Sequence, residues 1–177
     1  MAELEYIPHP ELVEILSGDL EPVLPPNVRE AMLDVILAWA NLDASTAFFA
    51  AALGDLNPDQ GADRFKRSVI ADKLKAAAKA LEELDQKDAA DLVRAIGEEY
   101  PDRALLRKRI AHSRCAGVKK SDPSRVVFLP YEREGPDGHL AVEVFPLERF
   151  ASNVEWARGV HVNLMSYVDK VQFFGSD

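Results

Sequence analysis

Apolar residues recur at helical spacing through most of the chain. From Asn27, a residue type that favours a helix N-cap, to Gly54 they return every three or four positions, which predicts one long helix. After a short polar connection, the same spacing predicts a second helix that carries the apolar residues from Phe65 to Leu84, and a long closing helix follows Pro146. Helices should therefore make up most of the protein.

The stretch between the second and the closing helix predicts two further helices and then a pair of strands. Residues 87–100 predict a shorter helix, and Pro101 predicts both its end and the first turn of another helix that frays near Gly117. Two runs rich in β-branched and aromatic residues, at 126–131 and 139–145, flank the turn residues EGPDG. They predict a β-hairpin between helices.

The first 26 residues differ from the rest because five prolines interrupt them. This leaves room only for a short helix over residues 11–18, so residues 1–26 are expected to form an arm packed on the core. Residues 27–177 are expected to form one domain. The predicted fold class is all-α: an up-and-down helical bundle of four main helices, with a small β-hairpin inserted before the last helix.

Composition narrows the class of protein. The 177 residues are 47% hydrophobic and 29% charged, as in ordinary globular domains, and the net charge of -9 argues against a protein that coats nucleic acid with its whole surface. The single cysteine, Cys115, cannot form an internal disulfide, and no Cys/His cluster has the spacing of a zinc site. Neither a secretory leader nor an apolar run of about 18 residues is evident, so we expect a cytoplasmic protein without membrane contact.

Positive charge is concentrated in residues 101–125. This basic segment holds eight Lys and Arg against two Asp, a net charge of +6 that leaves -15 on the rest of the chain. Its cations are Arg103, Arg107, Lys108, Arg109, Arg114, Lys119, Lys120 and Arg125. Three consecutive cations at 107–109 repel one another unless an anionic ligand, or acidic side chains of neighbouring helices, neutralise them. The acidic candidates are Glu82, Glu83, Glu98 and Glu99.

His112 is the only histidine beside several of these cations. An imidazole takes or gives a proton near neutral pH, and adjacent positive charge favours its neutral, basic form. Such a base, with an arginine on a non-bridging phosphate oxygen, suits cleavage of a phosphodiester through a ribose hydroxyl without a metal. From the residues alone, a histidine that ends a basic helix more often interacts with the helix dipole.

The string RKRIAH, from Arg107 to His112, resembles the Arg-x4-His signature of HEPN domains (higher eukaryote and prokaryote nucleotide-binding), and the order of the predicted elements is similar. The resemblance implies a helical bundle with the signature near the end of a late helix. Many members are metal-independent ribonucleases that serve as toxins or defence effectors. The resemblance therefore implies an endoribonuclease that needs no cofactor, acts on RNA or a nucleotide as a homodimer and has a protein antitoxin as partner. It assigns phosphate binding to Arg107 and acid/base catalysis to His112.

The sequence departs from the signature at Lys108, where active members often carry Asn or another small polar residue. This departure favours a competing interpretation, a non-catalytic helical interaction module whose basic segment binds a protein or a nucleotide. A third interpretation is a purely structural bundle without affinity for anions.

Helix geometry separates the two signature residues. Positions 107 and 112 lie about 140° apart around one helix and about 7.5 Å apart along it. Either the last turn unwinds before Gly117, or two subunits bring their motifs together in one cleft. Lys108 and Arg109 are the same-face neighbours of His112. The expected phosphate and RNA contacts are Lys108, Arg109, Arg114, Lys119 and Lys120.

Other reactive or aromatic residues have structural interpretations. Cys115 stands among cations that would lower the pKa of a thiol, but we expect an incidental, partly buried cysteine because no Cys-His site is completed nearby. His161, on the closing helix, is expected to be an interior histidine with satisfied hydrogen bonds, and lining the site is its alternative. Trp39 and Trp156 are expected to pack in the core.

Overall fold

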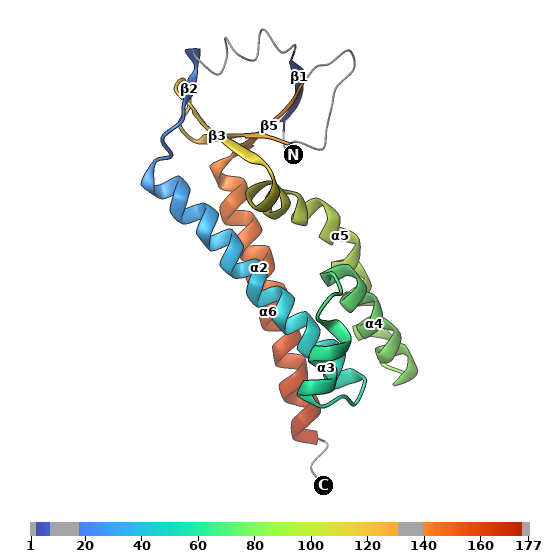
Figure 1. The fold of residues 1–177 in the computed structure, drawn as a ribbon. Helices are drawn as coiled ribbons and strands as arrows, with labels where there is room; N and C mark the ends of the chain where they lie inside the picture. Colours follow the sequence, from blue (N-terminus) through green and yellow to red (C-terminus); the bar gives the residue numbers. More distant parts are fainter. Residues whose placement is uncertain (1–2, 8–17, 131–139, 175–177) are drawn as a thin grey trace. The chain divides into compact units, whose positions relative to one another are not determined.

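A computed structural model describes residues 3–7, 18–130 and 140–174 (Figure 1). In chain order its elements are β1 (Glu3–Ile7), β2 (Leu20–Glu21), α2 (Pro26–Leu53), α3 (Pro58–Phe65), α4 (Ile70–Glu83), α5 (Lys87–His112), β3 (Arg114–Lys119), β4 (Arg125–Leu129), β5 (Leu140–Pro146) and α6 (Leu147–Phe174). The described part of the chain is mainly helical with one small antiparallel sheet, which confirms the broadly helical class. The short helix predicted over 11–18 lies outside the described residues, apart from Gly18.

The chain divides into two compact units. The first combines residues 1–36 with 104–154, and the second combines residues 37–103 with 155–177. Helices α2, α5 and α6 each contribute a part to both units. This division does not follow the expected boundary at residue 26, because β1 and β2 of the expected arm belong to the same sheet as β3, β4 and β5.

The first unit is built on a five-stranded antiparallel sheet in the order β1-β5-β4-β3-β2. The predicted hairpin is its centre, since β4 pairs with β5 and brings Val126 opposite Phe145. The prediction of a hairpin alone is wrong, because β3 pairs with the other side of β4 and both edge strands come from the N-terminal segment. Distant parts of the chain therefore meet in this unit.

Both faces of the central strands are buried. On one face, Val126 and Phe128 of β4 pack with Phe145 of β5, and the two phenyl rings meet edge to face with centroids 5.8 Å apart. The cluster on the other face is formed by Leu20, Val127, Val142 and Val144. The sheet thus carries a core on each side, which explains why β4 and β5 are apolar at almost every position.

Gly117 allows β2 to lie against β3. Strand β3 has an irregularity between Cys115 and Gly117, and Gly117 adopts a φ of +136°. A Cβ atom at this position would collide with the backbone oxygen of Glu21. Only glycine satisfies both the positive φ and the close approach of the neighbouring strand.

In the second unit, aromatic side chains join α2 to α6. Trp39 stacks on Trp156 with ring centroids 5.7 Å apart, and Phe49 meets Tyr167 edge to face at 5.6 Å. Residue numbers rise together along both helices, so α2 and α6 run parallel, as Figure 1 shows. The first and last helices of an up-and-down four-helix bundle run antiparallel, so the predicted bundle is not formed in that arrangement. The expected packing role of both tryptophans is confirmed.

Two helix boundaries also differ from the predictions. The second predicted helix is split into α3 and α4, and a capping box between Asn57 and Gln60 starts α3. Pro101 lies inside α5 and does not end it. An internal proline costs a helix about 3 kcal/mol. Because α5 buries Val93 before the proline and Leu106 after it, packing along the helix outweighs this cost.

Candidate functional site

The last two turns of α5 present the signature residues to solvent. Arg107, Lys108, Ala111 and His112 are exposed, whereas Arg109 is buried. At 100° per residue the four exposed residues occupy one arc of about 140°, with Arg107 at one edge and His112 at the other. One face of the helix therefore carries three of the predicted site residues.

Arg109 points to the opposite side and pairs with Glu143 of β5. Its Nε donates a hydrogen bond to Oε2 of Glu143 at 2.6 Å, and its Nη2 donates to Oε1 at 2.9 Å. The side chains of this buried pair are only 3% and 1% exposed. The pair corrects the expectation that Arg109 contacts RNA, because a buried guanidinium already bound to a carboxylate through two nitrogens is closed to a phosphate.

Glu99, one of the acidic residues expected to neutralise the basic segment, pairs with the first cation of that segment. Glu99 accepts a hydrogen bond from Nε1 of Trp156 at 2.9 Å and lies 3.6 Å from Arg103. Glu82 and Glu83 pair instead with cations of α4 and α5 that precede the basic segment. The expected neutralisation is therefore present at Arg103.

Two arginines beside the signature have no acidic partner. Arg107 and Arg114 form no ion pair within the ranges that the structure describes. Arg125, by contrast, donates from Nε to Asp122 at 3.2 Å. Hydrogen bonds from Ser124, with Arg125 alongside, hold the pKa of Asp122 below its ordinary value. Arg107 and Arg114 thus carry charge that no ion pair within the described ranges compensates, unlike Arg125.

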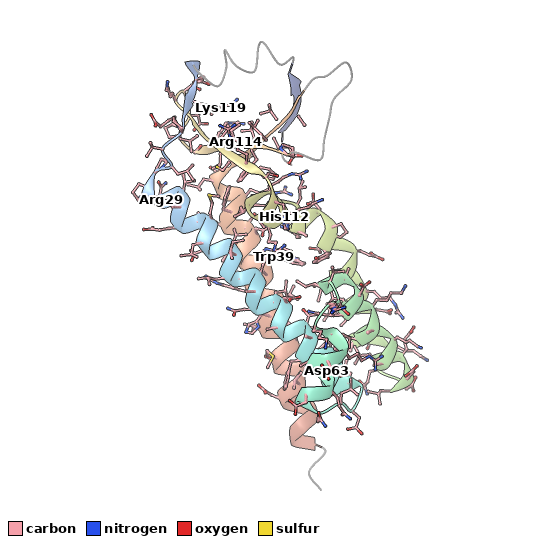
Figure 2. All side chains as sticks on the ribbon, viewed as in Figure 1. Arg29, Trp39, Asp63, His112, Arg114 and Lys119 are labelled. Atoms are coloured by element: carbon pink, nitrogen blue, oxygen red, sulfur yellow. The ribbon has the colours of Figure 1, made fainter. Side chains whose placement is uncertain are left out.

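The remaining predicted contacts are spread along β3. Figure 2 shows His112 at the end of α5, with Arg114 and Lys119 on the following strand. The six residues of β3 span about 17 Å. Lys119 and Lys120 therefore lie at the far end of the strand from His112, and Nζ of Lys120 donates to the backbone oxygen of Gly18 at 3.0 Å. Of the three cations Arg114, Lys119 and Lys120, Arg114 is the one next to the exposed residues at the end of α5.

The helix remains regular through His112. The backbone N–H of Ser113 still donates to the carbonyl oxygen of Arg109 at 3.0 Å, so the last turn does not unwind to bring Arg107 and His112 together. Unwinding, one of the two arrangements that the sequence leaves open, is therefore wrong. Within one chain the exposed cation nearest to His112 around the helix is Lys108, about 40° away.

Cys115 and His161 have different outcomes. Burial raises the pKa of the Cys115 thiol, although a hydrogen bond from the backbone of Gly117 opposes this effect. The expected partly buried, unreactive cysteine is consistent with that environment. Nδ1 of His161 is buried and has no hydrogen-bond partner in the described part of the chain, so the expectation of a fully satisfied histidine is wrong for this atom.

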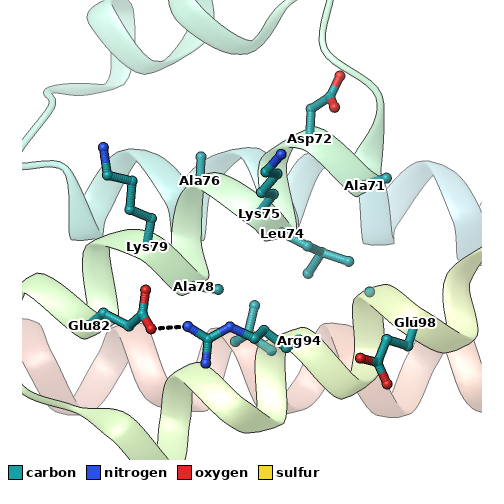
Figure 3. Close-up of a pocket in the computed structure, with 12 residues that line it drawn as sticks. Ala71, Asp72, Leu74, Lys75, Ala76, Ala78, Lys79, Glu82, Arg94 and Glu98 are labelled. Atoms are coloured by element: carbon teal, nitrogen blue, oxygen red, sulfur yellow. Dashed lines mark ion pairs between the residues drawn. The ribbon is translucent and has the colours of Figure 1, made fainter.

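The second unit holds a groove between α4 and the first half of α5 (Figure 3). Its volume is about 790 Å³, and Arg94 and Glu82 form an ion pair at its edge. Its small or apolar lining residues are Ala71, Leu74, Ala76, Ala78, Val93 and Gly97. None of the predicted site residues lines it. The sequence offers one signal for it, the Ala-rich middle of α4, which by itself indicates close helix packing.

No cluster of three His, Cys, Asp or Glu side chains suited to a metal ion occurs among the residues that the structure describes. Comparison of the chain with protein-family models, with curated proteins and with solved structures found no match. The functional argument therefore rests on the exposed residues at the end of α5 and on their chemistry.

Proposed function

We propose that the protein is a HEPN-like, metal-independent endoribonuclease that acts as a homodimer in the cytoplasm. Arg107 binds a non-bridging phosphate oxygen, and His112 exchanges the proton. Lys108 and Arg114 contact neighbouring phosphates, and Lys119 and Lys120 extend the track along β3. A role as a toxin or defence effector, with a protein antitoxin as partner, is part of the same proposal.

The observation that carries the proposal is the exposure of Arg107, Lys108 and His112 on one regular helix end while Arg109 is withdrawn into an ion pair. Like charges on adjacent positions repel one another, and burial of Arg109 against Glu143 removes one of the three charges from the surface. The two that remain lie on the same exposed arc as the imidazole of His112. This is the combination that binding and cleavage of a phosphodiester need.

The proposed reaction is an internal transesterification. His112 takes the proton of a ribose 2'-hydroxyl, and the resulting oxygen nucleophile attacks the adjacent phosphorus. The P–O5' bond breaks, the leaving oxygen receives a proton from a second acid, and a 2',3'-cyclic phosphate remains. Arg107 and Lys108 stabilise the negative charge that develops on the non-bridging oxygens. Solvent water is this second acid, so each site needs a single His112.

Matched substitutions test this proposal. His112→Ala and Arg107→Ala should each reduce cleavage of single-stranded RNA at least about 100-fold, in buffer that contains a chelator. The controls are His161→Ala and Arg158→Ala, which remove the same side chains from α6. Mass spectrometry of the products should find the cyclic phosphate. Absence of cleavage by the parent across varied RNAs, or full activity of the His112 variant, would contradict the proposal.

A second candidate function, a non-catalytic interaction module, is favoured by one observation. Within a single chain the cation beside His112 is Lys108, and the signature arginine lies at the other edge of the exposed arc. Such a surface suits binding of an acidic protein or a nucleotide without chemistry. Binding of RNA that weakens with salt, without any cleavage, would support this second candidate.

A further inference from the structure

The groove between α4 and the first half of α5 holds space that no described residue fills. All of its lining residues belong to the second unit. Leu74, Ala78 and Val93 lie at its floor and are buried. Gly97 lines it too, and a Cβ atom added there would meet no described atom within 4 Å. The volume of about 790 Å³ lies in the range of ligand sites, about 300 to 1,000 Å³.

The groove has the length and the lining of a seat for a helix. Its residues on α4 run from Ala71 to Glu82, which is about three helical turns or about 17 Å. Small residues line both sides, since Ala76 and Ala78 come from α4 and Gly97 comes from α5. Small side chains at contact positions let the axis of a neighbouring helix approach to about 8 to 10 Å. A third helix of three turns therefore fits against α4 and α5 together.

Charged side chains form the rim of the groove (Figure 3). They are exposed, and three are basic and three are acidic: Asp72, Lys75, Lys79, Glu82, Arg94 and Glu98. Glu82 of α4 pairs with Arg94 of α5. Asp72, Lys75 and Glu98 form no ion pair within the part of the chain that the structure describes. The unpaired charges of the rim therefore have both signs.

We infer that this groove binds an amphipathic helix of a partner protein. The helix lays an apolar stripe in the groove, turns an acidic side chain toward Lys75 and turns basic side chains toward Asp72 and Glu98. This mode of recognition, a helix in a groove, recurs among protein complexes. None of the groove residues belongs to the proposed RNA site, so the inference goes beyond the proposed function and does not rest on it.

The rim selects a helix over the other occupants. Three cations and three carboxylates cancel, so the groove attracts neither a polyanion nor an anionic membrane as a whole. A small molecule needs a site that encloses most of its surface, whereas this groove has six exposed side chains along its rim. An amphipathic helix covers the floor and pairs charges of both signs at once.

Two synthetic peptides of about 16 residues, long enough to form a helix, serve as probes. Both carry leucines at steps of three and four on one face, flanked by equal numbers of lysine and glutamate. The first peptide has its lysines near one end of the stripe and its glutamates near the middle, and the second has the two residue types exchanged. The full chain should bind the first peptide with a Kd below about 100 µM and the second at least about threefold more weakly.

Substitutions in the groove test the site. Gly97→Leu fills the groove without a collision, so it should weaken binding of the first peptide at least about tenfold. Gly159→Leu is the matched control, because Gly159 lies in α6 with open space around it and does not line the groove. Lys75→Glu should remove the preference, so that the two peptides bind within about twofold of each other. Lys66→Glu, at the end of α3, should preserve the preference. Circular dichroism checks that every variant folds.

Binding of neither peptide at about 1 mM, equal binding of both by the parent, or full binding by Gly97→Leu would overturn the inference. So would binding of anilinonaphthalene sulfonate that Gly97→Leu abolishes while no peptide binds, because the groove would then be a small-molecule site. The peptide assay contains no RNA. Selective peptide binding therefore supports the inference even where the parent cleaves nothing, and its absence does not affect the ribonuclease proposal.

Discussion

The buried pair between Arg109 and Glu143 provides the sharpest test of how the end of α5 is held. Two short hydrogen bonds join side chains that are 3% and 1% exposed, so water cannot replace a missing partner. Removing one member of such a pair leaves an uncompensated buried charge and costs roughly 3 to 5 kcal/mol. Replacing both members by apolar residues of similar size is often neutral, within about 1 kcal/mol.

Urea denaturation of four proteins measures these free energies of unfolding. Glu143→Leu and Arg109→Met should each fall in the costly range, while the double variant should lie near the parent. In thermal melts the single variants should lose about 10 °C, given roughly 2 to 4 °C per kcal/mol for a chain of this size. The loss of stability in the double variant should therefore be much smaller than the sum of the losses in the two single variants.

The exposed pair between Lys79 and Glu83 is the matched control. These side chains are 77% and 68% exposed and 3.7 Å apart, so Glu83→Ala should change the free energy of unfolding by no more than about 0.5 kcal/mol. Single variants of Arg109 and Glu143 that cost as little as this control would refute the reasoning. Additive losses in the double variant would refute it too, since each loss would then arise from packing and not from the pair.

Three further predictions concern a glycine, the cysteine and the cations. Gly117→Ala should destabilise the first unit by about 1 to 3 kcal/mol in urea, because the new Cβ would collide with Glu21 and Gly117 has a positive φ. Gly97→Ala should stabilise the protein by about 0.5 to 1 kcal/mol, because Gly97 lies in a helix with open space around it. Equal effects of the two substitutions would contradict this. Burial raises the pKa of Cys115, so its thiol stays protonated up to higher pH in the folded protein than in the unfolded chain. Iodoacetamide should therefore label the folded protein more slowly than the urea-unfolded protein near pH 8, and this difference should shrink as pH rises. Equal labelling rates at every pH would show that the thiol has an ordinary pKa. RNA affinity should be measured between about 50 and 200 mM salt for the parent and for Lys108→Gln. The slope of log affinity against log salt should be shallower by roughly 0.7 in the variant, because one phosphate contact is lost. An unchanged slope would show that Lys108 does not contact a phosphate.

Periodicity alone identified the long helices, because each buries a continuous stripe. The C-terminal end of α2 before Gly54 and the start of α6 after Pro146 agree with the sequence, but α2 begins at Pro26, so Asn27 lies inside the helix and is not its N-cap. The helix end predicted at Pro101 is wrong, because packing on both sides of the proline outweighs the few kcal/mol that a proline costs inside a helix. The extra strands could not be read from local pattern. The residues of β3 include two cations and a glycine, and β2 has two residues, so only pairing with distant segments defines them as strands.

The candidate site was predictable in part. The exposure of Arg107 and His112 agrees with the predicted site, but three consecutive cations hide the fact that one points inward. A signal was available, because Arg109 follows the apolar Leu106 by three positions, on the same side of the helix. Glu143 is the only charge within the apolar strand β5, which is typical of a buried carboxylate that needs a cation. Joining these two signals requires knowledge that α5 and β5 are adjacent, and no local pattern contains it.

A mixing experiment decides whether two chains share one site. A regular helix holds Arg107 and His112 at opposite edges of its exposed arc, so a composite site takes Arg107 from one chain and His112 from the other. Each dimer then has two sites. When Arg107→Ala and His112→Ala chains are mixed equally and allowed to exchange, half of the dimers are heterodimers, and each of these has one intact site and one doubly altered site. About a quarter of the parent's cleavage should return, although each variant alone is inactive. If each site lay within a single chain, every chain in the mixture would lack one essential group and no activity would return. Recovery therefore shows that the site is shared between subunits, and its absence, with exchange verified, shows that the divergence of the two side chains has another explanation.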